Sequence, residues 1–170
     1  MSWEPGCPVG LDDLRLAVLT HRGFDGRLHR GELVVHRSVA RDLGQVFAAL
    51  QEEDVPLRRV ERIERFGGSD DRSMAANNTS AFNCRRITSG SRWSEHAYGT
   101  AVDLNPVRNP YVRGSTVLPP AGRDYLNRAN VRPGMFVEGD VTVRAFDAAG
   151  WQWGGRWSSL KDYQHFEYPR

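Results

Sequence analysis

The sequence predicts a single α+β domain, built on a mostly antiparallel central sheet with helices on its flanks. The 170 residues suit one globular domain. A composition that is 39% hydrophobic and 26% charged can form a core and is not typical of disorder. The strand-like segments outnumber the helical ones and do not alternate cleanly with them, whereas a doubly wound parallel sheet requires that alternation.

The first third of the chain contains one clear amphipathic helix. Apolar residues recur at helical spacing over 39–53, Ser38 precedes them as a candidate N-cap, and Pro56 follows. The β-branched run at 31–36 predicts a strand before this helix. The other elements expected in this region are a short helix over 11–20 and a strand-like segment over 57–65.

The rest of the chain is predicted to contain one more helix and several short strands. Residues 67–79 are rich in turn-forming types and predict a loop, and a loop of this length in a compact domain is often functional. Asp140 is a candidate N-cap for a helix across 141–149, which Gly150 would end. Short strands are expected at 80–85, 101–105 and 164–168, and a loop rich in tryptophan and glycine at 151–157.

Composition also bounds the partners and the organisation of the chain. The net charge of +2 is too small to indicate nucleic-acid binding, for which a concentrated basic patch is expected. No apolar run approaches the roughly 20 residues that span a bilayer, and the first residues lack the basic and apolar regions of a signal peptide. We expect residues 1–30 to be an N-terminal extension that packs on a domain formed by residues 31–170.

The chain has two cysteines, Cys7 and Cys84. Two are too few for a disulfide scaffold, and the interpretation we favour is a pair of unlinked thiols. The alternative is a single bridge that pins the N-terminus to the segment near Cys84. Metal binding by either cysteine is disfavoured, because the sequence has no C-x-x-C spacing.

The most informative residues are two histidines and an aspartate that could hold a metal ion. His96 and Asp103 lie seven apart in the run S-E-H-A-Y-G-T-A-V-D, on a loop and at the start of the next strand. His165 lies in the last strand-like run, and Asp162 precedes it by three residues. A catalytic zinc site uses three protein ligands and leaves a position for water, whose proton a nearby carboxylate can accept.

Each of these residues also has a structural interpretation. Asp103 alone could be a hydrogen-bonded buried carboxylate, and His165 alone could be a core histidine. Their combination with His96 and Asp162 favours the metal site. Residues i and i+3 of a strand point to opposite faces, so we expect Asp162 in the turn that enters the last strand. There it would act as general base, and direct metal binding by Asp162 is the alternative.

Three further residues are candidate contacts to the substrate or the transition state. Arg85 could stabilise an oxyanion, although Arg86 adjoins it and a surface ion pair is the ordinary alternative. Ser94 could hydrogen-bond a substrate carbonyl or carboxylate, or cap a loop. Trp153 could contact the substrate, although tryptophans such as those in 151–157 more often pack in a core or a loop.

At these residues the chain resembles the M15 metallopeptidases, the D-Ala-D-Ala carboxypeptidase and L-alanyl-D-glutamate peptidase family that cuts peptidoglycan stem peptides. It is most similar to the subgroup that contains phage endolysins and bacterial wall endopeptidases. The matching blocks are spread over most of the chain, at 31–35, 73–85, 93–99, 101–106, 109–111, 150–157 and 162–167.

The resemblance implies a hedgehog/DD-peptidase-like fold and one Zn²⁺ per chain, bound by His96, Asp103 and His165. It further implies that Asp162 is the general base and Arg85 the transition-state cation, and it matches Ser94 to the serine just before the first zinc histidine. We expect a monomer that acts on peptidoglycan or its stem peptides. Such a protein would be made in the cytosol of a bacterium or phage host and act at the cell wall after release or export.

The expected function is zinc-dependent hydrolysis of stem peptides. The subgroup favours endopeptidase cleavage of the L-Ala-D-Glu bond, and D-Ala-D-Ala carboxypeptidase activity is the alternative. A non-catalytic wall-binding module that keeps the zinc fold is disfavoured, because the base and all three ligands are present.

Overall fold

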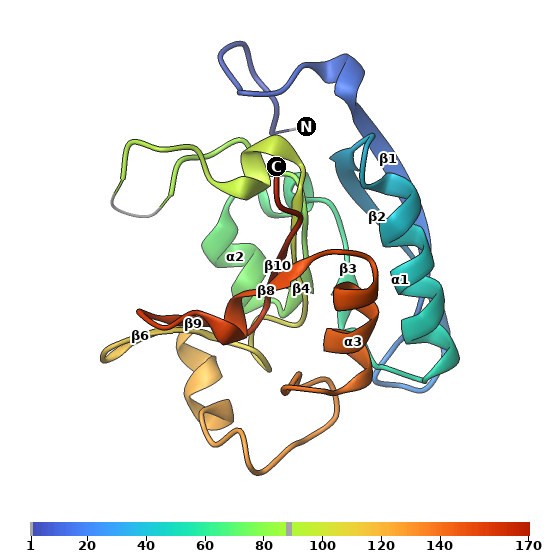
Figure 1. Ribbon diagram of the computed structural model, residues 1–170, viewed down its shortest axis with the longest axis vertical. Helices are drawn as coiled ribbons and strands as arrows, with labels where there is room; N and C mark the ends of the chain where they lie inside the picture. Colours follow the sequence, from blue (N-terminus) through green and yellow to red (C-terminus); the bar gives the residue numbers. More distant parts are fainter. Residues whose placement is uncertain (1, 88–89) are drawn as a thin grey trace.

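The computed structural model describes residues 2–87 and 90–170 and confirms the α+β class (Figure 1). Its helices are α1 (Ala40–Glu52), α2 (Asp70–Ala75) and α3 (Val141–Ala148). Its short 3-10 helices are η1 (Leu11–Asp13), η2 (Ile63–Phe66), η3 (Glu95–Tyr98), η4 (Pro120–Tyr125) and η5 (Gly154–Arg156). Its strands are β1 (Leu14–Arg22), β2 (Leu28–His36), β3 (Arg59–Val60), β4 (Asn78–Thr79), β5 (Ala101–Asp103), β6 (Tyr111–Arg113), β7 (Thr116–Leu118), β8 (Gln152–Trp153), β9 (Lys161–Asp162) and β10 (His165–Glu167).

The strands in the middle of the molecule come from distant parts of the sequence. β10 pairs antiparallel with β5 on one side and β8 on the other, while β3 and β4 pair in parallel. Two reciprocal backbone hydrogen bonds between Ser80 and Asp103, of 3.0 and 2.9 Å, connect β4 to β5. The strands therefore lie side by side in the order β3, β4, β5, β10, β8, at the centre of Figure 1. A separate antiparallel sheet, β7-β6-β9, joins the hairpin of β6 and β7 to the short strand β9 near the C-terminus.

The helix predicted over 11–20 is wrong. After η1 the chain forms β1, which pairs antiparallel with β2 along its full length. Leu16 and Val18 lie on the outer face of this hairpin and are 52% and 45% exposed, while Leu19 enters the core. Apolar residues on both faces hide the alternation by which a strand is recognised. The expected boundary after residue 30 falls within β2, and β1 packs against α1.

The helix predicted over 39–53 is confirmed as α1, but Ser38 is not its N-cap. Val39 occupies that position, and the Ser38 hydroxyl lies 2.7 Å from Nδ1 of His36. The apolar stripe of α1 is buried against the core, as periodicity predicts. The cap at Asp140 is confirmed, because its Oδ1 accepts a hydrogen bond from the backbone N–H of Val143 at 2.8 Å.

The segment 67–79 is not a plain loop, because it contains α2 and β4. The Ser69 hydroxyl accepts a hydrogen bond from the N–H of Arg72 and so caps α2. The strand predicted at 80–85 is extended chain instead: the N–H of Phe82 donates to Val34 O and the N–H of Asn83 donates to His96 O. These bonds hold the segment between β2 and η3.

Cys7 and Cys84 form a disulfide with Cα atoms 5.9 Å apart, so the favoured interpretation of two unlinked thiols is wrong. The bridge lies beside a small apolar cluster that contains Val9, Leu14 and Phe82. The alternative, a bridge that pins the N-terminus, is therefore the correct one. None of the helices that the structure describes is long and apolar enough to cross a bilayer.

Candidate active site

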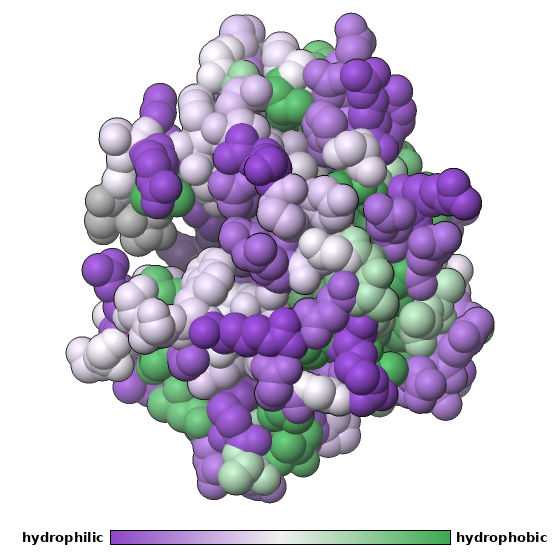
Figure 2. Space-filling model, viewed as in Figure 1, coloured by the Kyte–Doolittle hydropathy of each residue, from purple (hydrophilic) through white to green (hydrophobic). Residues whose placement is uncertain are grey.

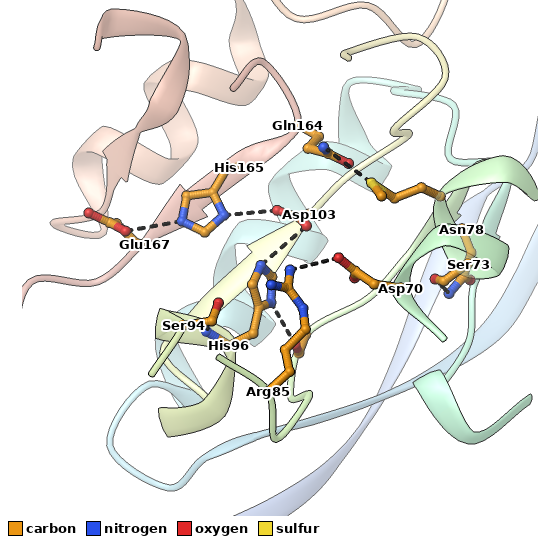
Figure 3. Close-up of polar contacts among 12 residues, drawn as sticks. Asp70, Ser73, Asn78, Arg85, Ser94, His96, Asp103, Gln164, His165 and Glu167 are labelled. Atoms are coloured by element: carbon orange, nitrogen blue, oxygen red, sulfur yellow. Dashed lines mark hydrogen bonds and ion pairs between the residues drawn. The ribbon is translucent and has the colours of Figure 1, made fainter. Parts of the chain in front are cut away.

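The three predicted metal ligands meet at one point of the central sheet (Figure 3). His96 comes from η3, Asp103 is the last residue of β5, and His165 is the first residue of β10, directly opposite Asp103. One possible ligand atom from each residue lies within 4.8 Å of the other two. All three side chains are buried, with residue exposures of 3 to 6%. His165 and Asp103 are 62 positions apart in the sequence, so the fold brings distant segments together in this group.

Local structure around η3 holds His96 in place. The Ser94 hydroxyl accepts a hydrogen bond from the N–H of His96 and caps the turn. Gly99 ends the turn at a positive φ of 72°, where a Cβ atom would meet the backbone nitrogen of His36 at 2.7 Å. Only glycine suits both this conformation and this close approach. The sequence S-E-H-A-Y-G therefore builds the turn that presents the imidazole.

The hydrogen bonds of His96 leave one ring nitrogen free to bind a cation. Its Nδ1 lies 2.7 Å from Ala81 O, a carbonyl that can only accept, so Nδ1 carries the proton. The lone pair of Nε2 then faces Oδ2 of Asp103 at 3.2 Å, although both atoms are acceptors. Nε2 has no hydrogen-bond partner in the described part of the chain. Ligands of one tetrahedral zinc, at roughly 2.0–2.2 Å from it, lie about 3.3 Å apart, so this pair fits a bound Zn²⁺.

His165 is held by carboxylates on both ring nitrogens. Nδ1 lies 2.9 Å from Oδ1 of Asp103, and Nε2 lies 3.0 Å from Oε2 of Glu167. Burial acts to lower the pKa of His165, but the hydrogen bonds to Asp103 and Glu167 outweigh it and raise the pKa to about 10. Burial opposes the charge on Asp103, yet His96 and His165 hold the pKa of that carboxyl well below its usual range.

Two imidazoles and one carboxylate are a donor set that suits Zn²⁺. A histidine that binds zinc usually donates its second ring N–H to a carboxylate or carbonyl. Ala81 O takes this part for His96 and Glu167 takes it for His165. The residues present therefore fit the predicted metal. Our sequence reading missed Glu167, although its i, i+2 spacing from His165 places both side chains on one face of β10.

Asp162 is the last residue of β9 and immediately precedes the turn that leads into β10, close to its predicted place. Its Oδ1 is buried without a hydrogen-bond partner among the described residues. Burial, and then the nearby charge of Asp103, raise the pKa of Asp162 to about 7. A Cβ atom at Gly154 would lie 2.7 Å from the carbonyl oxygen of Asp162, so the close packing of η5 on β9 requires glycine.

Arg85 lies beside this group but is paired with an acid that our sequence reading missed. Its Nη2 lies 2.7 Å from Oδ2 of Asp70, a largely buried residue at the start of α2 (Figure 3). Burial raises the pKa of Asp70, and the charge of Arg85 opposes that rise. The only signal of Asp70 in the sequence was its place in the turn-rich segment 67–79. Arg86 is excluded from this role, because its guanidinium stacks on Trp93 at 4.2 Å.

A cavity of about 680 Å³ connects these residues to solvent. Both histidines, Asp103, Asp162, Arg85 and Ser94 line it, and Figure 2 shows the surface hollowed at its left side. Trp153 does not line it. Its ring is 4% exposed, donates from Nε1 to Tyr163 O and stacks near Phe166. The predicted substrate contact of Trp153 is therefore corrected to a core role, and Trp157 lines the cavity instead.

A family model described as D-alanyl-D-alanine carboxypeptidase matches residues 88–168, just under half of the chain. The matched part contains the three candidate ligands, Asp162 and Glu167 but not Arg85 or Asp70. The comparison with solved structures found no match. The family match supports a place for this chain among the M15 peptidases, as its sequence motifs predict.

Proposed function

We propose that this protein is a zinc-dependent peptidase that hydrolyses peptidoglycan stem peptides. The observation that carries the proposal is the buried group of His96, Asp103 and His165 in the wall of an open cavity, with the unpaired carboxylate of Asp162 in the same wall. A purely structural cluster gives no reason for a buried carboxylate oxygen without a hydrogen-bond partner beside a cavity. The family match supports a peptidase of this kind.

Asp162 is the proposed general base. A bound Zn²⁺ in such a site polarises a carbonyl and acidifies a water molecule. The Asp162 carboxylate takes the proton of the attacking water and then gives it to the nitrogen of the leaving amine. Burial raises the pKa of this carboxyl, which favours its uptake of the proton from the attacking water.

Arg85 and Ser94 are the proposed partners of the substrate itself. The guanidinium of Arg85 donates hydrogen bonds to the oxyanion that forms as water attacks the scissile carbonyl. Its ion pair with Asp70 holds the guanidinium in place before the substrate arrives. The Ser94 hydroxyl lines the cavity next to His96 and is proposed to bind a substrate carbonyl or carboxylate.

Two scissile bonds remain candidates. The resemblance to wall endopeptidases favours the L-Ala-D-Glu bond, and this is the first proposal. The description of the matching family favours removal of the terminal D-Ala, and this is the second. For either bond we propose a monomer that is made in the cytosol of a bacterium or phage host and acts on the cell wall.

The test is digestion of purified peptidoglycan and synthetic stem peptides, with the products read by mass spectrometry. The zinc-loaded wild type, Asp162→Ala and the exposed control Asp124→Ala are compared. We expect cutting by the wild type and the control but not by Asp162→Ala, with equal zinc content in all three. Product masses then identify the bond. Stoichiometric zinc without any cleavage would favour a non-catalytic wall-binding module, and an active Asp162→Ala would remove the base assignment.

A further inference from the structure

The acidic side chains in the wall of the cavity are almost all neutralised by partners within the protein. Asp70 pairs with Arg85, Glu95 with Arg170, and Glu167 with His165. Asp103 contacts both histidines. Asp162 is the exception, because its Oδ1 has no hydrogen-bond partner among the described residues.

Two cations of the same cavity have no such partner. Arg92 and Arg113 line the cavity, and neither guanidinium makes a hydrogen bond, ion pair or ring contact with any other residue that the structure describes. Both side chains are exposed at its rim. The third arginine of the wall, Arg85, already has Asp70. At its rim the cavity therefore offers the unpaired positive charges of Arg92 and Arg113 to an incoming molecule.

The position of Arg113 follows from strand geometry. β6 and β7 form a hairpin in which Tyr111 faces Leu118 and Arg113 faces Thr116. Side chains at i and i+2 share a face of a strand, and these four residues all line the cavity. Tyr111 also pairs with Asp162 on β9, so the face that carries Arg113 continues towards the proposed base.

Arg92 belongs to a different wall. It lies in the segment that leads into Ser94, where its carbonyl accepts a hydrogen bond from the N–H of Ile87 at 3.0 Å. This segment and the β6-β9 sheet project on the same side of the molecule, at the upper left and lower left of Figure 1. The hollow in Figure 2 lies between them. The two unpartnered arginines therefore come from separate segments that line the same cavity.

We propose that Arg92 and Arg113 bind free carboxylates of the substrate, so that the cavity selects peptides that carry free carboxylates near the scissile bond. The proposal rests on the proposed peptidase function. A guanidinium group binds a carboxylate through two parallel N–H donors and through the attraction of opposite charges. A carboxamide is neutral and cannot form this ion pair. Because both arginines lie at the rim, we expect their effect mainly on KM and on its dependence on salt.

The test uses two synthetic stem peptides that contain both candidate bonds, L-Ala-D-Glu and D-Ala-D-Ala. One keeps all the free carboxylates of the stem peptide, and in its twin these groups are carboxamides. For the wild type we expect kcat/KM to be about tenfold lower on the carboxamide twin, mostly through KM. The double variant Arg92→Gln/Arg113→Gln should cut both peptides at similar rates. Arg41→Gln, which removes an exposed arginine on α1 outside the cavity, should keep the wild-type preference.

A second readout separates this proposal from the function on which it rests. Both peptides are titrated into Asp162→Ala, with and without the two arginine substitutions, so that Kd is measured without turnover. Tighter binding of the carboxylate peptide that disappears with the two arginines supports the proposal even if the wild type cuts neither peptide. Equal use of both peptides by the wild type, or a preference that survives the double substitution, would overturn it.

Discussion

Glu167 is the residue that fixes how His165 can bind a metal. Its Oε2 lies 3.0 Å from Nε2 of His165, and a carboxylate there accepts the Nε2 proton. Nδ1 is then the nitrogen that is free for the metal, on the side of Asp103. The imidazole would otherwise be free to rotate or to carry its proton on the ligating nitrogen.

We therefore expect Glu167→Gln to weaken zinc binding by about 10- to 100-fold without loss of folding. A competition titration with a chelator measures the affinity, and circular dichroism measures the fold. The matched control is Glu95→Gln, which removes another carboxylate of the cavity wall, one that pairs with Arg170. Equal zinc affinity in wild type and Glu167→Gln would show that His165 is positioned by other contacts.

His21 gives a prediction for stability against pH. It is 6% exposed, its Nδ1 has no hydrogen-bond partner among the described residues, and it packs 5.6 Å from His29. Burial, and then the charge of His29, hold the pKa of His21 below its ordinary value of 6.5. The unfolded chain therefore takes up this proton more readily than the folded protein does. Stability that depends on a neutral His21 is present above pH 6.5 and is lost as the pH falls below it.

The expected result is that His21→Gln flattens the pH dependence of the unfolding free energy below pH 6.5. One proton can contribute a slope of at most about 1.4 kcal/mol per pH unit. Urea unfolding of the zinc-free wild type and variant between pH 5 and pH 7.5 measures the difference. Parallel curves over that range would show that His21 does not contribute to the acid sensitivity.

At this scale the sequence predicted the residues that lie within a single motif. His96 and Asp103 stand in one run, and Asp162 and His165 in another, so their types and spacing are visible in the chain. Asp70 was missed because its role depends on a contact with Arg85, 15 residues away and on a different element. The pairing of Cys7 with Cys84 was disfavoured because cysteines 77 positions apart carry no spacing signal.

Elements were predictable where one face of a helix is apolar over several turns. α1 meets this condition and was predicted from periodicity, whereas α3 was predicted from its N-cap Asp140 and the glycine at its end, and both have boundaries within two residues of the prediction. α2 does not meet the condition, because six residues give fewer than two turns. β1 was mistaken for a helix because its outer face is also apolar. The short strands of the central sheet owe their pairing to partners far along the chain, which no local pattern reveals.

α2 carries the prediction that belongs to this scale. Its first residue, Asp70, places a carboxylate 2.7 Å from Arg85, so the position of the guanidinium depends on this short helix. We expect Asp70→Asn to lower kcat by about tenfold with little change in KM, because a charge-assisted contact to Arg85 is weakened. Arg85→Ala should lower kcat by about 100-fold or more.

The matched control is Asp71→Asn, which removes the neighbouring acid of the same first turn. The decisive comparison is the double variant. If Asp70 acts through Arg85, Asp70→Asn should have little further effect in an Arg85→Ala background. Additive losses in kcat would show that Asp70 has a separate role in the reaction.

For the molecule as a whole, the disulfide ties the first residues to the segment that carries the site. Cys84 precedes Arg85, and the same segment supplies Ala81 O to His96. The N–H of Cys84 also bonds to the Ser2 hydroxyl. The cluster of Val9 and Phe82 beside the bridge is small, so it has little apolar area with which to hold the terminus alone.

We therefore expect the disulfide to contribute strongly to global stability. A bridge between cysteines 77 positions apart restricts a long loop of the unfolded chain, which corresponds to about 4.5 kcal/mol in the loop-closure model. Cys7→Ser/Cys84→Ser should lower the unfolding free energy by this order, measured by urea unfolding of the zinc-free protein. A phosphine reductant should destabilise the wild type to the same extent and leave the double variant unchanged.

Because Arg85 and His96 both depend on the tethered segment, the reduced wild type should also lose kcat at a temperature where it stays folded. A reduced protein that is as stable and as active as the oxidised one would show that the central sheet alone holds the segment in place.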